Sequence, residues 1–275
     1  MRGTRWHPRR RLWPWLVGFV ALGLAAALFV WQIVLRDTTT PVPVAKAVDS
    51  FRATDDAPAS TAATEAATDV AALPAAGVYL YATLGGEEVD ALGGTRHDYP
   101  TTTTVTVTGG GCGVVLRWDA LEERSEELEL CRRDGSLVVP RYTSFHRFFS
   151  QDDSRPYRCD EPIVLVPADP LAGTTMTSRC QADDLIEDIT VTVVGAEPVD
   201  IEDGTVDAIH VRLATELGTD DDSTTGDATS DLWLAMDGTV LRWTEQTRTT
   251  ADSLVGDVHY DESFELELSA LEPVR

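Results

Sequence analysis

The stretch DLWLAMDGTVLRWT, residues 231–244, is the clearest structural signal in this sequence. Short runs rich in aliphatic and aromatic residues flank Asp237-Gly238 on both sides, which is typical of β-strands. An Asp-Gly pair supplies the positive φ values that a two-residue type I′ turn needs. We therefore expect a β-hairpin with this turn at its tip.

An apolar period of two, which is typical of half-buried β-strands, occurs elsewhere in the chain, for example in segments 105–107, 189–193 and 209–213. About a dozen candidate strands lie between Gly77 and Arg275, with no long helix among them. The sequence predicts a mainly β domain over 77–275, built as a strongly curved antiparallel sheet, either a half-barrel or a closed barrel. We expect the polar stretch 219–231 to be a long hairpin loop.

Alternation also predicts which side chains face the inside of this sheet. A dozen strands form a surface that one short helix covers only in part, so either the sheet closes around its core or an apolar cavity remains. Such a cavity would hold lipid-like material, because burial of each CH₂ contributes about 0.8 kcal/mol. The aliphatic and aromatic residues expected to line it are Val191, Val193, Val211, Leu213, Leu234, Phe264 and Leu266.

Residues 13–35 carry no charge and are long enough, as a helix, to span the hydrocarbon core of a bilayer. Five arginines precede this stretch and Arg36 follows it, so the N-terminus is expected inside the cell. A cleaved signal peptide is the alternative, but the stretch is longer than a typical signal core. We expect a basic cytoplasmic tail (1–12), a transmembrane helix (13–35) and an extracytoplasmic remainder in the cell membrane.

Residues 36–76 are rich in Thr, Ala, Pro and Asp, which is typical of an extracytoplasmic linker. One short helix is predicted within it, over 44–53, because Val44, Ala47, Val48 and Phe51 fall on one helical face. A helix of this length does not persist alone. It either docks on the outer domain through Val48 and Phe51 or forms only transiently, and we expect docking.

The four cysteines, Cys112, Cys131, Cys159 and Cys180, all lie in the predicted extracytoplasmic part, where disulfides are stable. Of the three possible pairings, hairpin symmetry favours Cys112 with Cys131 and Cys159 with Cys180. Simple alternation places Cys112 and Cys131 on opposite faces, so a bulge is expected between them. Zinc is not expected, because no C-x-x-C pair occurs.

Composition and motifs exclude several functions. The chain has 46 acidic and 22 basic residues, which excludes binding to a phosphate backbone by the outer domain. A serine-hydrolase elbow, a P-loop, an H-E-x-x-H pair and a dinucleotide fingerprint are all missing from the sequence. We therefore expect no catalytic, cofactor-binding or metal-binding residues, and no enzyme.

Two groups of polar residues remain as weaker candidates. His97 is expected in a turn beside Arg96 and Asp98, where it would orient a ligand or cap a strand, whereas His210 and His259 alternate onto the polar side of their strands. The acidic cluster within 219–231 resembles a calcium loop in part. Leu232 stands where such a loop needs a bidentate glutamate, so a solvated loop is expected there.

Four stretches together resemble a known group of proteins: GVYLYATLGGEEVDALGGTRHDYP (77–100), LEER (121–124), DLWLAMDGTVLRWTEQTRT (231–249) and ELELSALEP (265–273). They resemble uncharacterised single-pass membrane proteins of actinobacteria with an all-β extracytoplasmic domain. More loosely, the Leu-Trp-Leu strand and its return strand are similar to the sheet of LolA-like and LppX-like carrier lipoproteins. That second resemblance implies a half-barrel around an apolar cavity, although this chain lacks a lipidated cysteine.

The sequence thus predicts a membrane-anchored extracytoplasmic binding or scaffold domain of the cell envelope, without catalysis. Its partners would be the membrane and either an apolar ligand or another envelope protein. A lipid or apolar-ligand handling protein is one alternative, and an enzyme with an unrecognised site is the other.

Overall fold

The computed structural model describes residues 38–55, 72–253 and 256–275. The predicted cytoplasmic tail (1–12), the predicted span (13–35) and part of the predicted linker lie outside these residues. Within the described part of the chain, no helix has the length and apolarity needed to cross a bilayer.

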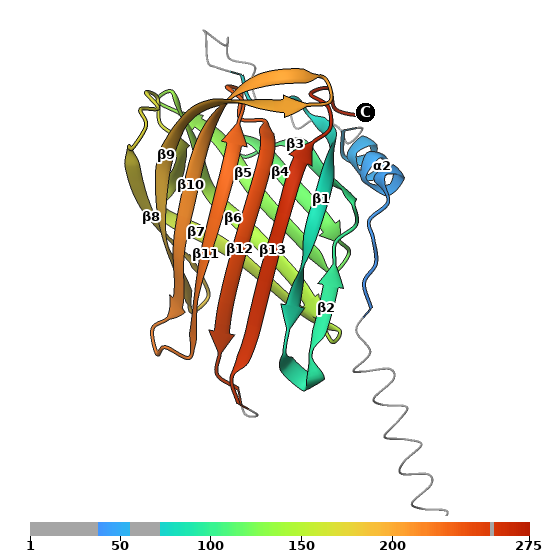
Figure 1. Cartoon of the computed structure of the whole chain (residues 1–275), viewed down its shortest axis with the longest axis vertical. Coiled ribbons are helices and arrows are strands. Elements are labelled where there is room, and N and C mark those ends of the chain that lie inside the picture. The colour runs from blue at the N-terminus through green and yellow to red at the C-terminus, as the bar shows by residue number, and fades with distance from the viewer. Residues whose placement is uncertain (1–37, 56–71, 254–255) are drawn as a thin grey trace, which may run out of the picture. The chain divides into compact units, whose positions relative to one another are not determined.

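Thirteen antiparallel strands form one sheet that closes on itself, because β1 (Gly77–Val89) pairs with β13 (Val258–Leu268). Each strand otherwise pairs with its neighbours in sequence, except that β1 pairs with β3 through residues 77–82 and with β2 through residues 86–89. The result is the predicted mainly β fold in its closed, barrel form (Figure 1). The other strands are β2 (Thr95–Asp98), β3 (Thr102–Gly110), β4 (Gly113–Leu121), β5 (Arg124–Arg133), β6 (Ser136–Phe148), β7 (Gln151–Val166), β8 (Thr175–Ala182), β9 (Leu185–Ile201), β10 (Gly204–Thr219), β11 (Thr224–Leu234) and β12 (Val240–Ala251).

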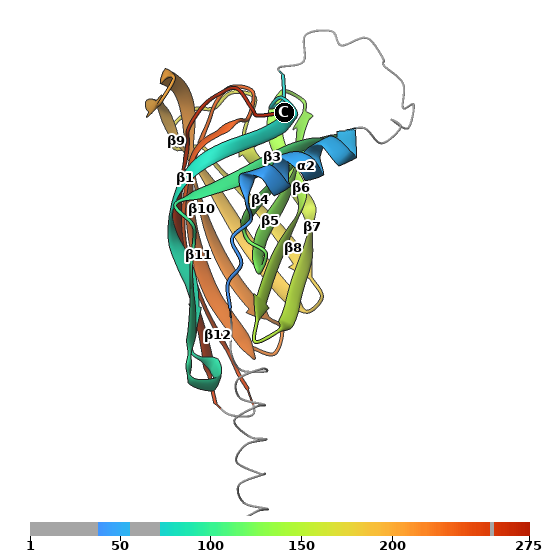
Figure 2. The same cartoon turned by 90° about the vertical axis from the view of Figure 1, so that its right-hand side faces the viewer.

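The predicted short helix is confirmed as α2 (Val44–Asp55), which lies on the outside of the barrel against β1 and β3 (Figure 2). Val48 and Phe51 are buried and pack on Val78 of β1, as expected for docking. The chain before the helix is also bound, since the backbone of Thr40 exchanges hydrogen bonds with Glu122 and with the carboxylate of Glu123. Residues 40–54 therefore belong to the folded domain instead of a free linker.

Alternation along the strands explains the core. On β13, Glu262, Phe264, Leu266 and Leu268 are buried, while the residues between them are exposed or half-buried. Because the ring is closed, the inward face of each strand meets the inward faces of the opposite wall, and one apolar cluster fills much of the interior.

The β11–β12 hairpin forms, but the predicted type I′ turn at Asp237-Gly238 is wrong. Only Gly238 has a positive φ, of 91°, and its N–H donates to the carbonyl of Ala235. The connection is thus a β-turn followed by a left-handed glycine, and the Asp237 carboxylate accepts from the N–H of Thr239 at 2.8 Å. A turn with positive φ at both central residues occurs instead at Asp134-Gly135, between β5 and β6.

The expected long loop over 219–231 is also wrong. β10 continues to Thr219 and β11 starts at Thr224, so the connection is residues 220–223. Residues 225–231 pair with both β10 and β12. Their threonines suit a half-exposed strand because β-branched side chains favour extended backbone. The carboxylate of Asp221 accepts hydrogen bonds from the Thr219 hydroxyl and the Ser223 N–H, which stabilises the tight turn.

The predicted disulfides, Cys112–Cys131 and Cys159–Cys180, are both confirmed. An irregularity does lie beside the first pair, because the register between β5 and β6 shifts between Leu128 and Cys131, whereas between β4 and β5 Gly113 pairs with Cys131 in regular register. Cys112 precedes β4 and lies in the β3–β4 turn, so its side chain is free of the strand alternation on which the expectation rested.

Candidate functional site

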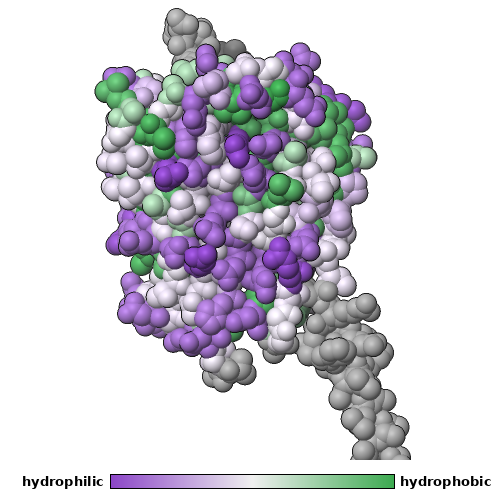
Figure 3. Space-filling model, viewed as in Figure 1, coloured by the Kyte–Doolittle hydropathy of each residue, from purple (hydrophilic) through white to green (hydrophobic). Residues whose placement is uncertain are grey.

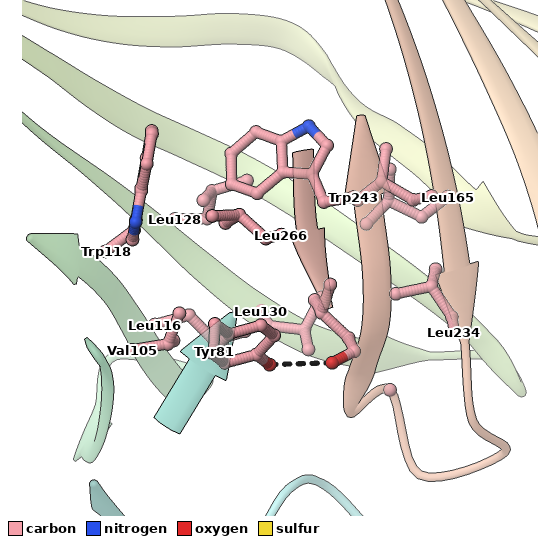
Figure 4. Close-up of a pocket in the computed structure, with 13 residues that line it drawn as sticks. Tyr81, Val105, Leu116, Trp118, Leu128, Leu130, Leu165, Leu234, Trp243 and Leu266 are labelled. Carbon is pink, nitrogen blue, oxygen red and sulfur yellow. Dashed lines mark hydrogen bonds between the residues drawn. The ribbon is translucent and has the colours of Figure 1, made fainter. Parts of the chain in front are cut away.

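The inside of the barrel is divided into two parts, which we call the apolar half and the polar half. The apolar half surrounds an internal cavity of about 30 Å³ (Figure 4). Its one hydroxyl group, on Tyr81, donates to the carbonyl of Val240 at 2.6 Å. The cavity is lined by Tyr81, Val105, Leu116, Trp118, Leu128, Leu130, Leu165, Leu232, Leu234, Gly238, Val240, Trp243 and Leu266.

A layer of aromatic rings separates the two halves. Trp118 lies 4.5 Å from Phe264 and 5.9 Å from Trp243, measured between ring centroids. The indole N–H of Trp118 donates to Thr103, whereas the buried indole N–H of Trp243 has no hydrogen-bond partner. In Figure 4 the nitrogen of Trp243 lies on the side of its ring away from Tyr81. One buried donor at the edge of the cavity thus lacks an acceptor.

The polar half begins directly behind this layer, with Arg124 at the start of β5. Its guanidinium lies 5.5 Å from the centre of the Trp118 ring and donates two hydrogen bonds to Glu262, of 2.9 and 3.1 Å. A third bond, of 2.9 Å, reaches Glu126, and Tyr99 also donates to Glu262. Arg124 and Glu262 are almost fully buried, so each charge depends on the other for stabilisation.

Glu87 forms the second centre of the polar half. It is fully buried and accepts hydrogen bonds from His97 and His146, each at 2.8 Å, and from Tyr260 at 3.1 Å. Burial by itself would raise the pKa of Glu87, but the two histidine hydrogen bonds outweigh it and lower the pKa to about 2. The Tyr260 hydroxyl lies 3.0 Å from Glu262 and so joins the two centres.

Cross-strand register places these groups together. Glu87 on β1 stands directly opposite Glu262 on β13 and opposite His97 on β2, so the three form one row around the wall. Arg124 on β5 stands opposite His146 on β6. Neighbouring strands therefore bring like charges side by side, and hydrogen bonds from the facing wall stabilise them.

Two further carboxyl groups in the polar half have pKa values that are raised to near neutral pH. Burial, with added repulsion from Glu245 and Glu262, raises the pKa of Glu126 to about 8 despite the attraction of Arg124. Burial and the charge of Glu262 raise the pKa of Glu245 to about 7. The polar half can therefore take up and release protons between pH 7 and 8.

The structure changes the interpretation of two histidines. His97 lies in strand β2, not in a turn, and contacts Glu87 and the ring of Phe148, whereas Arg96 is exposed and pairs with Asp98 on the outside. His210 is nearly buried, because the β9–β10 hairpin brings Glu197 to within 3.0 Å of it. His259 is exposed, as expected.

The predicted cavity residues all lie in or against the core, but only some of them meet at the cavity. Val191, Val193, Val211, Phe264 and Leu266 are buried together with Leu234, and Leu213 is partly buried. Of the seven, Leu234 and Leu266 line the cavity. Its other walls come mainly from β1, β3, β4, β5, β7 and β12, which the prediction left out.

The polar half was missed, although the sequence contains a signal for it. Glu262 stands two residues from Phe264 and four from Leu266, in the inward phase of the same strand. A charged residue in the apolar phase of a strand marks a buried ion pair. The partners, such as Arg124 on β5, could not be identified without the closed ring.

The comparisons with known proteins found similar solved structures and no family. No protein-family model and no curated protein matches the chain. Among solved structures, it is similar to a candidate lipoprotein from Parabacteroides distasonis (9% identity, TM-score 0.29, covering 72% of this chain and 98% of that one). It is also similar to a protein with a YmcC-like fold from Bacteroides fragilis (10%, 0.31, 73% and 98%) and to the hypothetical lipoprotein YmcC from Escherichia coli (14%, 0.29, 83% and 96%).

Proposed function

We propose that this chain is a membrane-anchored extracytoplasmic binding domain of the cell envelope that receives an apolar ligand in its barrel, without catalysis. The observation that carries the proposal is the cavity, whose walls offer hydrocarbon and aromatic surface. An apolar group gains free energy by entering such a space, since no buried charge has to be neutralised.

The polar half supports binding over catalysis. Its histidines, tyrosines and the carboxylates of Glu87 and Glu262 are hydrogen-bonded to one another. Glu87, His97 and Glu262 are also buried, so none of the three presents a reactive atom to solvent. This network closes one end of the apolar half and sets the polarity that a ligand meets there.

The size of the cavity limits the size of the group that it can hold. A volume of about 30 Å³ accommodates only about two or three water-sized groups, so a hydrocarbon chain enters only if the walls move apart. The proposal therefore predicts a ligand whose end, rather than whole length, occupies the cavity in this state.

The test uses the full chain in lipid nanodiscs and a fatty acid that carries a photoactivatable diazirine at the end of its chain. After illumination, we expect labelled peptides that contain Trp118, Leu165 or Trp243. The variant Leu165→Trp, which fills the cavity, should lose this labelling. Labelling restricted to residues 13–35, or equal in both proteins, would contradict an apolar ligand in the barrel.

A scaffold function is the second candidate, and the surface favours it at one place. The outer surface in Figure 3 is mainly hydrophilic over its lower half, and hydrophobic residues gather toward the upper end. Leu171, Met236 and Leu271 are 62%, 66% and 41% exposed. If another envelope protein binds there, Met236→Asp should abolish co-purification of a defined partner and Leu84→Asp, an equally exposed site on β1, should not.

A further inference from the structure

The seam between β7 and β8 differs from every other seam around the ring in its short ladder. Only Arg158–Gln181 and Cys159–Cys180 are paired, although the strands continue to Val166 and back to Thr175. Residues 160–166 and 175–179 all lie in the described part of the chain. Had the ladder continued, Glu161 would stand opposite Ser178 and Ile163 opposite Met176.

Two prolines explain why the ladder stops. On its other side, β7 pairs with β6, and the register jumps from Val139–Ile163 to Arg141–Arg158. Residues 159–162 of β7 therefore stand opposite Pro140 alone. Pro140 and Pro162 both lack an N–H, so neither can donate to a ladder. The register irregularity toward β6 and the end of the ladder toward β8 thus fall on the same stretch of β7.

Few bonds hold this seam. At the end of the seam where β7 and β8 pair, the Cys159–Cys180 disulfide joins the strands covalently. Beyond it, the hydroxyl of Ser178 donates to the carbonyl of Glu161 at 2.5 Å. The other seams are joined by backbone ladders of four or more residue pairs, so separation here breaks the fewest hydrogen bonds.

The seam also leads to the cavity. Leu165 belongs to the part of β7 that does not pair with β8, and its side chain forms one wall of the cavity (Figure 4). Ile163 and Val166 on the same segment are buried, and Met176 on β8 packs against the same core. A hydrocarbon chain that passes between the strands would meet apolar side chains along its whole path.

We propose that the β7–β8 seam above the Cys159–Cys180 disulfide is a lateral binding site for a hydrocarbon chain, which passes between the strands and places its end in the cavity beside Leu165. The proposal rests on the proposed function for the identity of the ligand. The site itself rests on the ladder, the prolines and the cavity wall.

The first test is hydrogen exchange of the full chain in nanodiscs, followed by mass spectrometry. Peptides that cover 160–166 and 175–179 should exchange faster than peptides that cover the paired parts of β10 and β11. Equal protection on both sides of the ring would overturn the seam as an opening. This result does not depend on any ligand.

The second test compares two buried serines, each of which donates one hydrogen bond. Ser178→Ala removes the bond across the seam, whereas Ser230→Ala removes a bond to Glu245 on the far side of the ring. With the diazirine fatty acid, Ser178→Ala should increase the rate of labelling at Leu165 by about threefold to tenfold, and Ser230→Ala should leave it unchanged. Equal labelling rates in the two variants would overturn entry through the seam. No labelling in any variant would overturn the proposed function, and the hydrogen-exchange result alone would then decide whether the seam opens.

Discussion

The two halves of the barrel interior are built by the same strands and yet differ completely in chemistry. On β13, Leu266 borders the cavity, and four residues earlier Glu262 is bonded to Arg124. On β1, Tyr81 borders the cavity and Glu87 holds two histidines. The inward-facing side chains of one strand thus change from hydrocarbon to a hydrogen-bonded ion network within a few inward-facing positions. An aromatic layer separates the two environments.

The two halves should also respond differently to loss of a side chain. In the apolar half a deletion leaves a larger space, whereas in the polar half it leaves a buried charge without its counter-charge. The second loss is the more costly, because the remaining charge has neither water nor a partner. The following predictions test that contrast in the full chain.

The largest effect is expected for Arg124→Met. Glu262 loses both guanidinium hydrogen bonds and Glu126 loses one, so the free energy of unfolding should fall by about 3–5 kcal/mol. Urea titration with tryptophan fluorescence measures it. The control is Arg117→Met, whose ion pairs with Asp119 and Glu127 lie at the surface and should contribute no more than about 1 kcal/mol. Equal losses would refute the contrast.

Leu266→Ala should have the next largest effect. Leu266 is fully buried and already borders the cavity, so the substitution enlarges an existing space and should cost about 2–4 kcal/mol. Leu84→Ala on β1 is the matched change, because Leu84 is 66% exposed and should stay within about 0.5 kcal/mol of the native value. The same urea titration compares them.

The pH dependence should be set by the polar half. Glu126 has its pKa raised to about 8 in the folded protein, so the folded state holds a proton that the unfolded state has released. Its contribution is therefore complete below the unfolded pKa and is lost as pH rises toward 8. The free energy of unfolding should fall by about 1–3 kcal/mol between pH 5 and pH 8.5, and Glu126→Gln should reduce that slope and leave the part that comes from Glu245.

An acid limb should follow from Glu87, in the opposite direction. Its pKa is lowered to about 2, so its contribution is present above the unfolded pKa and is lost as pH falls toward 2. Glu126→Gln should leave this limb unchanged, which makes the acid limb an internal control. An alkaline slope that is as steep in Glu126→Gln as in the native protein would show that Glu126 does not cause it.

The smallest effect is expected for Tyr81→Phe. The variant keeps the ring at the cavity wall and loses only the hydrogen bond to the carbonyl of Val240, so the cost should be about 1 kcal/mol. A loss as large as that of Leu266→Ala would mean that the hydroxyl, and not the hydrocarbon surface, stabilises the apolar half.

Local patterns in the sequence predicted the strands and the short helix, which depend on residues a few positions apart, and both disulfides, which join cysteines 19 and 21 residues apart across hairpins. The turn at Asp237-Gly238 was predicted wrongly, since the Asp237 carboxylate accepts a hydrogen bond from the N–H of Thr239 and so favours a different turn. Only one partner of Glu87 is local: His97 stands opposite it on the neighbouring strand β2, whereas His146 reaches it from β6 across the barrel and could not be predicted. The prolines at 140 and 162 were visible, but their effect on pairing depends on their standing near each other across two strands.

Closure of the ring through β1 and β13 also sets the order of events during synthesis and folding. β1, which begins at Gly77, can complete its pairing only after β13, which ends at Leu268, has been synthesised. The final pairing therefore joins segments almost 200 residues apart. Until then both edge strands present unpaired backbone groups, which are open to other chains. A nascent chain that stalls before residue 258 is thus expected to aggregate, and its completed copy is expected to fold slowly.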